Sequence, residues 1–479
     1  MPTPPGRPLR RPGTAVGLAA VLLGLTYGYD GTAMAGAQIL VTEVFHLSPF
    51  EQGTLYAGPV IGLMAGTVLA GRLSDAAGRR GALALAAAVC SLTTVVSALS
   101  VNPVMLVGTR AVLGMTMGVL IVVAPILFAE SVRTAIRGRV AVLYQCATAG
   151  GCAATYFVSY LLAGGGHWRV MLVVPALCAA AAAVSLLRLP ETPGWHLAKG
   201  RPDRAAEAAR VLALDGPEPV SAPEAPSAAA PAKGRMAELF GPTYRRLTLF
   251  VVTLGFLVQI TGISAIGYFS PRIFQRMGYE GNFSLLMLPG LIQLLSAVAA
   301  LVCAVAIDRV SRRAALLTGT GLMTAGHLLL VGVFAEFLPA SAGLLGLAVF
   351  AIGFNAGFGA LIWVFAAEGF PGRLRGAGAS AMLLANLGAN LIIAQFFLSA
   401  LSALGGTATF CLLLAVNVAA WCYVYLQVPD TTGRTLAEIE AYWVNGRRWN
   451  GPGSDPGPAP GATTRAAAGE GDRLRDGPP

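Results

Sequence analysis

The sequence predicts an all-α membrane protein with twelve transmembrane helices, arranged as two pseudo-symmetric six-helix bundles. Two observations carry this prediction. Of the 479 residues, 55% are hydrophobic and only 12% are charged, whereas about 25% of the residues of a soluble protein are charged. The same charged motifs also occur twice in the same order, separated by 233 to 239 residues. A repeat of this length and direction indicates that one half of the chain duplicates the other.

Twelve apolar stretches reach the roughly 20 residues that a helix needs to cross a bilayer. They lie at 14–36, 53–73, 81–101, 104–128, 140–163, 168–188, 245–270, 283–307, 314–335, 342–367, 377–402 and 406–428. Five segments are therefore expected. They are an N-terminal tail (1–13), a six-helix bundle (14–190), a connector with short helices and a Pro/Ala-rich linker (191–243), a second six-helix bundle (244–428), and a C-terminal helix with a disordered tail (429–479).

Arginines are unevenly shared between the two sets of connections. They precede the first span and fill the connections that follow even-numbered spans, whereas the opposite connections carry few. By the positive-inside rule the arginine-rich side is cytoplasmic, so both termini are expected on the cytoplasmic side of the cell membrane. The net charge of +10 then reflects topology, and no nucleic-acid partner is expected.

Acidic residues accompany these arginines in both halves, and we name the whole group the loop charge set. It comprises Asp75, Arg79, Arg80, Glu130 and Arg137 in the first half, and Asp308, Arg312, Glu368 and Arg375 in the second. Arginines that only fix the orientation would leave the acids unexplained. Ion pairs made in one arrangement of the halves and broken in another would bias the equilibrium between the two arrangements.

Two charged residues fall within or near apolar spans. Asp30 lies mid-span in the first helix and Arg110 lies near the start of the fourth, where insertion of each charge costs roughly 2.5–3.5 kcal/mol. Such a pair could simply fix one helix against the other. It could also act as a proton switch, because a carboxylate pairs with a guanidinium only while it is ionised.

Polar side chains recur inside the other spans. They are Gln145, Gln259, Ser264, Gln293, Ser296, Asn386 and Asn390. An amide offers both a donor and an acceptor, which suits a neutral polyhydroxylated solute. The alternative is that these groups link helices, at about 0.6–2 kcal/mol each. Further polar groups in the spans include Asn355, Asn417 and His327, and the last is interpreted as a packing residue.

The motifs together resemble the sugar porter family of the major facilitator superfamily, from Gly28 to Leu436. The resemblance rests on Gly-Tyr-Asp-Gly (28–31), the basic loop 71–80, Arg110, the motif 125–130, Arg137-Gly138, Gln145, Pro-Glu-Thr-Pro (190–193), 259–263, 368–371, 375–376 and 429–436. It implies a binding cavity at the membrane midplane between the two halves, and alternating access to that cavity.

The resemblance also implies roles for individual residues. Asp30 and Arg110 correspond to the proton-coupling pair, Tyr268 and Phe269 to aromatics that cover the outer mouth of the cavity, and the loop charge set to a cytoplasmic latch between the halves that is closed when the protein faces outward. Gln145, Gln259 and Asn386 correspond to positions that bind sugar hydroxyls, and Trp363 is retained. Aromatics such as Tyr268 could alternatively be membrane-interface anchors.

Several positions depart from the family pattern. Val258 replaces one of two adjacent glutamines, Ser264 and Ser296 replace asparagines, and Leu387 replaces a tryptophan. A standard hexose would therefore find fewer partners. Gln293, one turn from Ser296, and Asn390, one turn from Asn386, could supply some of the missing contacts.

The expected function is secondary active transport of a small hydroxylated solute, a sugar or polyol, with proton symport. The eroded sugar contacts keep open an alternative, proton-antiport export of a metabolite or antibiotic, and a solute sensor without transport is a further alternative. The sequence contains no phosphate-binding loop of the type used by ATP-driven proteins. No enzymatic activity, cofactor or metal is expected, and the protein is expected to be a monomer.

Overall fold

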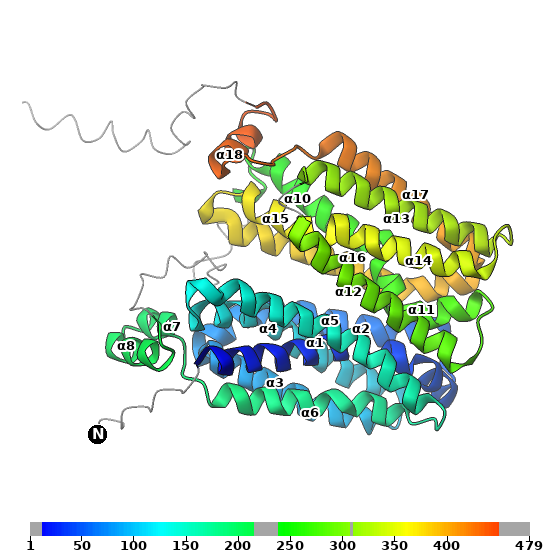
Figure 1. The fold of residues 1–479 in the computed structure, drawn as a ribbon, viewed down its shortest axis with the longest axis horizontal. Helices are drawn as coiled ribbons and strands as arrows, with labels where there is room; N and C mark the ends of the chain where they lie inside the picture. The colour runs from blue at the N-terminus through cyan, green and yellow to red at the C-terminus, as the bar shows by residue number, and fades with distance from the viewer. Residues whose placement is uncertain (1–11, 215–237, 307–309, 450–479) are drawn as a thin grey trace, which may run out of the picture.

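The computed structural model describes residues 12–214, 238–306 and 310–449 (Figure 1). These residues form helices and connecting turns and contain no β-strand, which agrees with the predicted fold class. The expected tail at 1–13 lies almost wholly outside the described residues. The Pro/Ala-rich linker and the C-terminal tail from residue 450 also lie outside them.

Six long helices form the first half, which lies at the bottom of Figure 1. They are α1 (Pro12–Phe45), α2 (Pro49–Ala77), α3 (Arg79–Ala98), α4 (Pro103–Ser131), α5 (Thr134–Ala163) and α6 (Trp168–Leu187). Two short helices follow, α7 (Pro193–Ala198) and α8 (Pro202–Val211). Thr192 caps α7, since its side chain accepts a hydrogen bond from the Trp195 amide.

The second half forms the upper bundle, and its described residues contain three π-helical segments. In chain order it comprises α10 (Arg245–Val258), η1 (Gln259–Ile263), α11 (Ser264–Arg276), η2 (Phe283–Met287), α12 (Leu288–Ala306), α13 (Arg312–Phe334), α14 (Ala340–Phe354), η4 (Asn355–Gly359), α15 (Ala360–Gly369), α16 (Gly372–Ala403) and α17 (Gly405–Gln427). A final helix, α18 (Leu436–Val444), begins with a capping box formed by Thr435 and Glu438.

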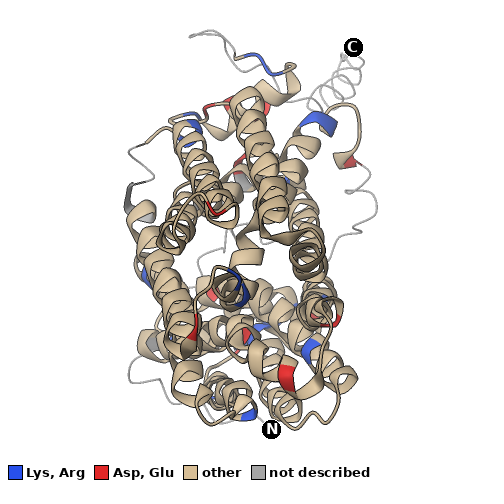
Figure 2. Cartoon of the chain, turned by 90° about the vertical axis from the view of Figure 1, so that its right-hand side faces the viewer, with Lys and Arg blue, Asp and Glu red and all other residues tan. Residues whose placement is uncertain are grey.

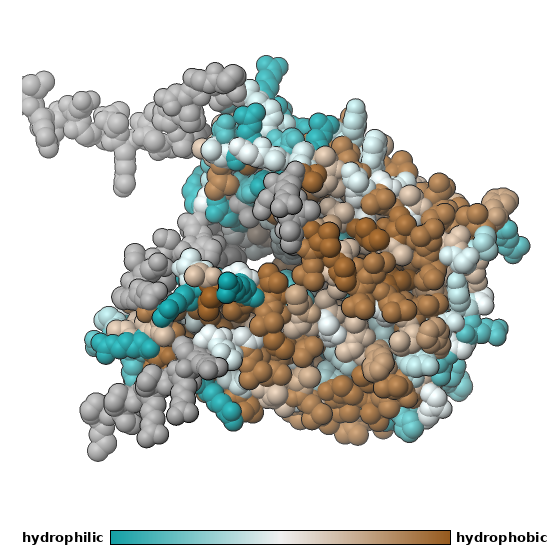
Figure 3. Space-filling model, viewed as in Figure 1, coloured by the Kyte–Doolittle hydropathy of each residue, from teal (hydrophilic) through white to brown (hydrophobic). Residues whose placement is uncertain are grey.

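Eleven helical segments among the described residues are long and apolar enough to cross a membrane. Helix α1 is not one of the eleven, but it is 34 residues long and packs against α5 and α6. The arrangement is therefore consistent with the twelve predicted spans. On the face shown in Figure 3, a broad apolar belt is bordered by hydrophilic residues at both ends. The chain is a multi-pass membrane protein.

Glycines allow the helices of the first half to approach closely. A Cβ at Gly62 of α2 would lie 1.9 Å from the carbonyl oxygen of Ala111 in α4. A Cβ at Gly114 of α4 would lie equally close to the carbonyl oxygen of Pro59 in α2. Small residues at such crossings let two backbones touch, which is the main route to tight helix packing inside a membrane.

The two ends of the molecule differ, and we name them the basic end and the far end. The basic end carries the starts of α1, α3, α5, α13 and α16, and the surface is hollowed between the halves there (left in Figure 3). At the far end α2 meets α16: a Cβ at Gly53 would lie 2.2 Å from the carbonyl oxygen of Gln395, and Gln395 Nε2 donates to Phe50 O at 3.1 Å. Viewed from the far end, few residues are charged (Figure 2). The halves are thus in contact at the far end and separated at the basic end.

Candidate functional site

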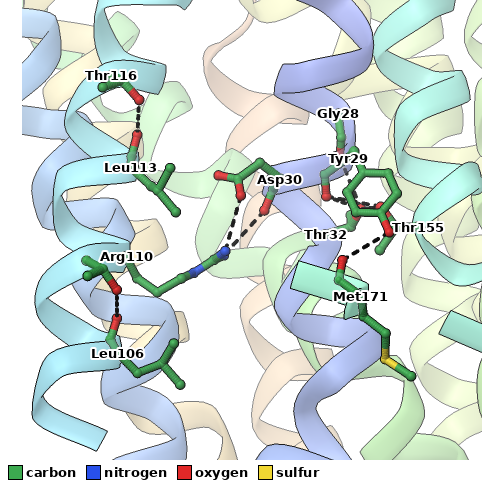
Figure 4. A network of polar contacts seen from close by, with 11 residues as sticks. Gly28, Tyr29, Asp30, Thr32, Leu106, Arg110, Leu113, Thr116, Thr155 and Met171 are labelled. Atoms are coloured by element: carbon green, nitrogen blue, oxygen red, sulfur yellow. Dashed lines mark hydrogen bonds and ion pairs between the residues drawn. The ribbon is translucent and has the colours of Figure 1, made fainter. Parts of the chain in front are cut away.

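Asp30 and Arg110 form a buried ion pair between α1 and α4 (Figure 4). Arg110 Nη1 lies 3.3 Å from Asp30 Oδ1, and Arg110 Nη2 donates to the backbone carbonyl oxygen of Asp30, also at 3.3 Å. The side chains are only 5% and 6% exposed for Arg110 and Asp30. Arg110 Nε is buried and has no hydrogen-bond partner among the described residues. An acid whose charge is balanced by one fixed guanidinium can hold or release a proton with a direct effect on helix contacts.

Neighbouring residues of α1 determine which way Asp30 points. Gly28 brings α1 against α5, since a Cβ there would lie 1.9 Å from Thr148 O. Tyr29 Oη donates to Met171 O of α6 at 3.1 Å, and Thr155 of α5 donates to Tyr29 O at 3.0 Å. Because successive side chains of a helix point about 100° apart, this anchoring of Tyr29 turns Asp30 toward α4, as Figure 4 shows.

A second polar group lies in the second half, around the break η1. Gln259 Nε2 donates to Asn386 Oδ1 of α16 at 3.2 Å, and Asn386 Nδ2 donates to Gly255 O of α10 at 3.2 Å. Ser264 Oγ donates to Gln259 Oε1. The structure therefore brings together three of the predicted site residues from two segments of the chain.

The remaining predicted cavity residues are distributed over α5, α12, α15 and α16. Ser296 accepts a hydrogen bond from Asn355 Nδ2 at 2.7 Å. Gln145 and Gln293 make no hydrogen bond within the described residues, and the first is exposed and the second half-buried. Trp363 of α15 is 48% exposed. Such amides without protein partners are free to bind another polar molecule.

Aromatic residues of the two halves meet toward the far end. Tyr268 stacks on Tyr56 of α2 with ring centroids 5.1 Å apart, and Phe269 meets the same ring edge-on at 4.7 Å. Asn390 Nδ2 donates to Tyr268 Oη at 3.2 Å. Tyr56 was missed by the sequence analysis, because an aromatic residue in an apolar span carries no signal of its own. The two predicted gate residues thus join the halves through a partner that was not predicted.

The loop charge set forms ion pairs inside each half. Arg79 lies 3.6 Å from Asp75 and 3.5 Å from Glu130, and Arg312 binds Glu368, with 2.9 Å between Nη2 and Oε1. Arg80 Nη1 donates to Leu189 O at 2.9 Å. Arg137 and Arg375 each bury an Nε without a hydrogen-bond partner among the described residues. Asp308 lies outside the described residues.

A third acid of each repeat holds the connection at the basic end: Glu191 follows α6, and its counterpart Asp430 follows α17. Glu191 accepts hydrogen bonds from the amides of Arg80 and Gly81 at 3.1 and 3.3 Å, which caps the start of α3. The backbone of Gly78 has a φ of 85°, and a Cβ there would collide with Glu191. Only glycine fits both conditions.

Asp430 has the equivalent place in the second half. Ser311 Oγ donates to it at 2.7 Å, and Thr432 donates to it and accepts a hydrogen bond from the Arg312 amide at 2.9 Å. Partial burial raises the pKa of Asp430, but the hydrogen bonds from Ser311 and Thr432 outweigh this and hold the pKa below its ordinary value. The motifs 190–193 and 429–436 contained both acids, but the sequence analysis missed that Glu191 caps α3 and that Asp430 binds Ser311 and Thr432 at the start of α13.

Known proteins resemble the chain over nearly its whole length. A family model described as "Sugar (and other) transporter" matches residues 16–443. The arabinose-proton symporter of Bacillus subtilis (strain 168) is 30% identical over 447 residues, which cover 90% of this chain and 94% of the relative. The probable polyol transporter 6 of Arabidopsis thaliana is 27% identical over 461 residues, covering 88% of this chain and 92% of the relative.

A solved structure shares the fold. The inward-open xylose transporter from E. coli matches with a TM-score of 0.76 at 23% identity, over 90% of this chain and 100% of that one. The family model spans both six-helix bundles, the buried pair of the first and the amide group of the second. The chain therefore belongs to the sugar transporter family, the sugar porters of the major facilitator superfamily.

Proposed function

We propose that the protein takes up a sugar or polyol together with protons, by alternating access. The observation that carries this proposal is the buried pair of Asp30 and Arg110. A protonated Asp30 loses its charge attraction to Arg110, and an ionised Asp30 regains it, so the two protonation states favour different positions of α1 against α4. A proton gradient can drive a solute only through such a difference between states.

The solute is a small, neutral, hydroxylated molecule that binds between the halves. Gln145, Gln259, Gln293, Ser296, Asn386 and Asn390 offer uncharged donors and acceptors, and Trp363 offers an apolar ring face, as sugars require. Arabinose and polyols appear in the names of two relatives, and these solutes are the first to test. The relative named a proton symporter favours symport over export by antiport.

The basic end faces the cytoplasm of the cell, with both termini on that side, because arginines are retained there during membrane insertion. The recess at the basic end (Figure 3) then opens inward, and Tyr56, Tyr268 and Phe269 form the closed outer gate. The loop charge set forms a latch that closes the basic end when the protein faces outward. In the inward-facing conformation its members pair within each half instead, as Arg79 does with Glu130.

One chain supplies both halves of the binding region, so the protein acts as a monomer. Its reaction is translocation and involves no enzymatic step and no nucleic acid.

The test is uptake into proteoliposomes with and without an inward proton gradient. L-arabinose, D-xylose and sorbitol are supplied outside, and uptake is compared with that of empty liposomes. Accumulation of one of them that depends on the gradient is the expected result. Binding without uptake would support a sensor, and uptake unaffected by the gradient would support a facilitator.

A further inference from the structure

The helix that carries Gln259 is broken next to it. At η1 the backbone of Gly262 adopts φ 105° and ψ 7°, a left-handed conformation that only glycine takes without strain. Such a break frees backbone groups that a continuous helix would pair, and inside a membrane each freed group needs another partner. The carbonyl oxygen of Thr261 finds one in the side chain of Asn417 on α17, whose Nδ2 lies 3.1 Å away.

Asn417 is itself held by His327 of α13. Asn417 Nδ2 lies 2.7 Å from His327 Nδ1, and both side chains are 0% exposed. Asn417 Nδ2 also lies 3.5 Å from Leu413 O of its own helix. Nδ1 of His327 accepts a hydrogen bond from this amide nitrogen in the tautomer that carries the ring proton on Nε2. Phe350 and Phe410 flank this ring with centroids 4.8 and 6.1 Å away, which fixes its plane.

The pair reaches η1 from outside the binding region. Helices α13 and α17 lie on the side of the second half away from the first half (Figure 1), whereas Gln259 extends toward Asn386 of α16. The ring of His327 also lies against Gly262, because a Cβ there would meet His327 Nε2 at 3.4 Å. His327 and Asn417 therefore contact the break without facing the solute.

We propose that His327 and Asn417 are positioning residues, which hold the break at Thr261 and Gly262 in one geometry and thereby place Gln259 for solute binding. The placing of Gln259 for solute binding rests on the proposed function. The control of the break concerns the protein without any solute. The two parts are therefore tested separately.

The first test is amide hydrogen exchange of the full chain in nanodiscs, read on peptides that cover residues 258–268. Asn417→Leu removes the donor to Thr261 O, and His327→Phe removes the acceptor that orients Asn417. Both should raise exchange at η1 at least severalfold, because the break loses its fixed partner. His327→Asn keeps an acceptor near the place of Nδ1 and should restore slow exchange.

Thr409→Val is the matched control. Thr409 is a buried polar residue of the same helix α17, but it bonds only within that helix, to Gly405 O at 2.8 Å. Its loss should leave exchange at η1 unchanged. Wild-type exchange at η1 in Asn417→Leu, or an equal rise in Thr409→Val, would overturn the proposal.

The second test measures L-arabinose affinity in a double-mutant cycle. Asn417→Leu should weaken binding about tenfold, a loss in the range of one buried hydrogen-bond partner. In a Gln259→Ala background the same change should weaken it less than about twofold, because the side chain that the pair positions is already gone. Equal losses in both backgrounds would overturn the positioning role. If wild-type protein does not bind L-arabinose, that choice of solute fails, and hydrogen exchange alone decides the proposal.

Discussion

Arg110 binds Asp30 twice, through the carboxylate and through the backbone carbonyl oxygen, with both distances at 3.3 Å. Only the first contact depends on the charge of Asp30. Protonation therefore weakens the pair without releasing the guanidinium completely, because the carbonyl oxygen does not titrate. A contact that is only partly weakened suits a switch between two states of similar energy. A few kcal/mol are enough to shift the equilibrium between such states.

Asp30→Asn should abolish gradient-driven accumulation and preserve solute binding and exchange. Asparagine keeps the shape of a protonated acid but cannot ionise, so the change of charge during the cycle is lost. Uptake into proteoliposomes with an imposed proton gradient measures the first effect, and counterflow of labelled solute measures the second. Glu51→Gln, a change at an exposed acid of α2, serves as the control. Accumulation by Asp30→Asn would show that the pair is structural.

Arg110→Ala should destabilise the protein more than Asp30→Asn does. It leaves a carboxylate buried without its partner, which costs roughly 3–5 kcal/mol when a buried pair is broken. Combining both changes removes the unpaired charge and should recover most of the loss. Thermal unfolding of the three variants in detergent tests this order. A double variant no more stable than Arg110→Ala would mean that the arginine stabilises α4 through contacts other than the carboxylate.

The sequence predicted Asp30 and Arg110 because a charge in an apolar span stands out from its surroundings and is expensive to bury. It predicted the fold because twelve apolar stretches and a repeat leave few other arrangements. Tyr56 was missed, and His327 and Asn417 were noted as polar groups without their mutual contact, since the roles of all three depend on which backbone or ring lies opposite them. Glu191 was seen as part of a repeated motif, but a cap that spans 110 residues of chain needs the folded connection.

The two predicted glutamines should contribute differently to binding. Gln259→Ala removes a solute contact and leaves Asn386 Oδ1 without its donor, whereas Gln145→Ala removes a side chain that has no hydrogen bond within the described residues. Each variant should weaken binding of the transported solute by about 1–3 kcal/mol, and Gln259→Ala should also lower thermal stability. Calorimetric titration and unfolding measure the two effects, and Gln427→Ala, near the end of α17 and away from the amide group, is the control for binding. Wild-type affinity in both variants would place the solute elsewhere.

Glu130→Ala and Arg375→Ala should each slow turnover while leaving membrane insertion intact. Glu130 pairs with Arg79 at 3.5 Å in the present conformation, and Arg375 buries an Nε without a partner among the described residues, so both have contacts to gain or lose when the halves move. Initial uptake rates at matched protein amounts give the measurement. Arg204→Ala on α8 controls for the loss of one basic charge. Normal rates in both variants would reduce the loop charge set to a determinant of orientation.

Gly53→Val should hold the far end open. A Cβ at Gly53 would lie 2.2 Å from Gln395 O, a backbone atom of α16 that cannot move aside alone, so α2 and α16 must separate. If closure of the far end is part of the cycle, this variant should still bind solute from the outer side but should lose net uptake. Gly150→Val is the matched control, because a Cβ at Gly150 meets nothing within 4 Å.

The decisive measurement uses Tyr268→Cys in each background. It records how readily a membrane-impermeant thiol reagent labels the new cysteine. Increased labelling from outside in the Gly53→Val background is expected, since the separation uncovers the gate. Unchanged labelling together with normal uptake would mean that the contact between α2 and α16 adapts to the added side chain and does not close the far end.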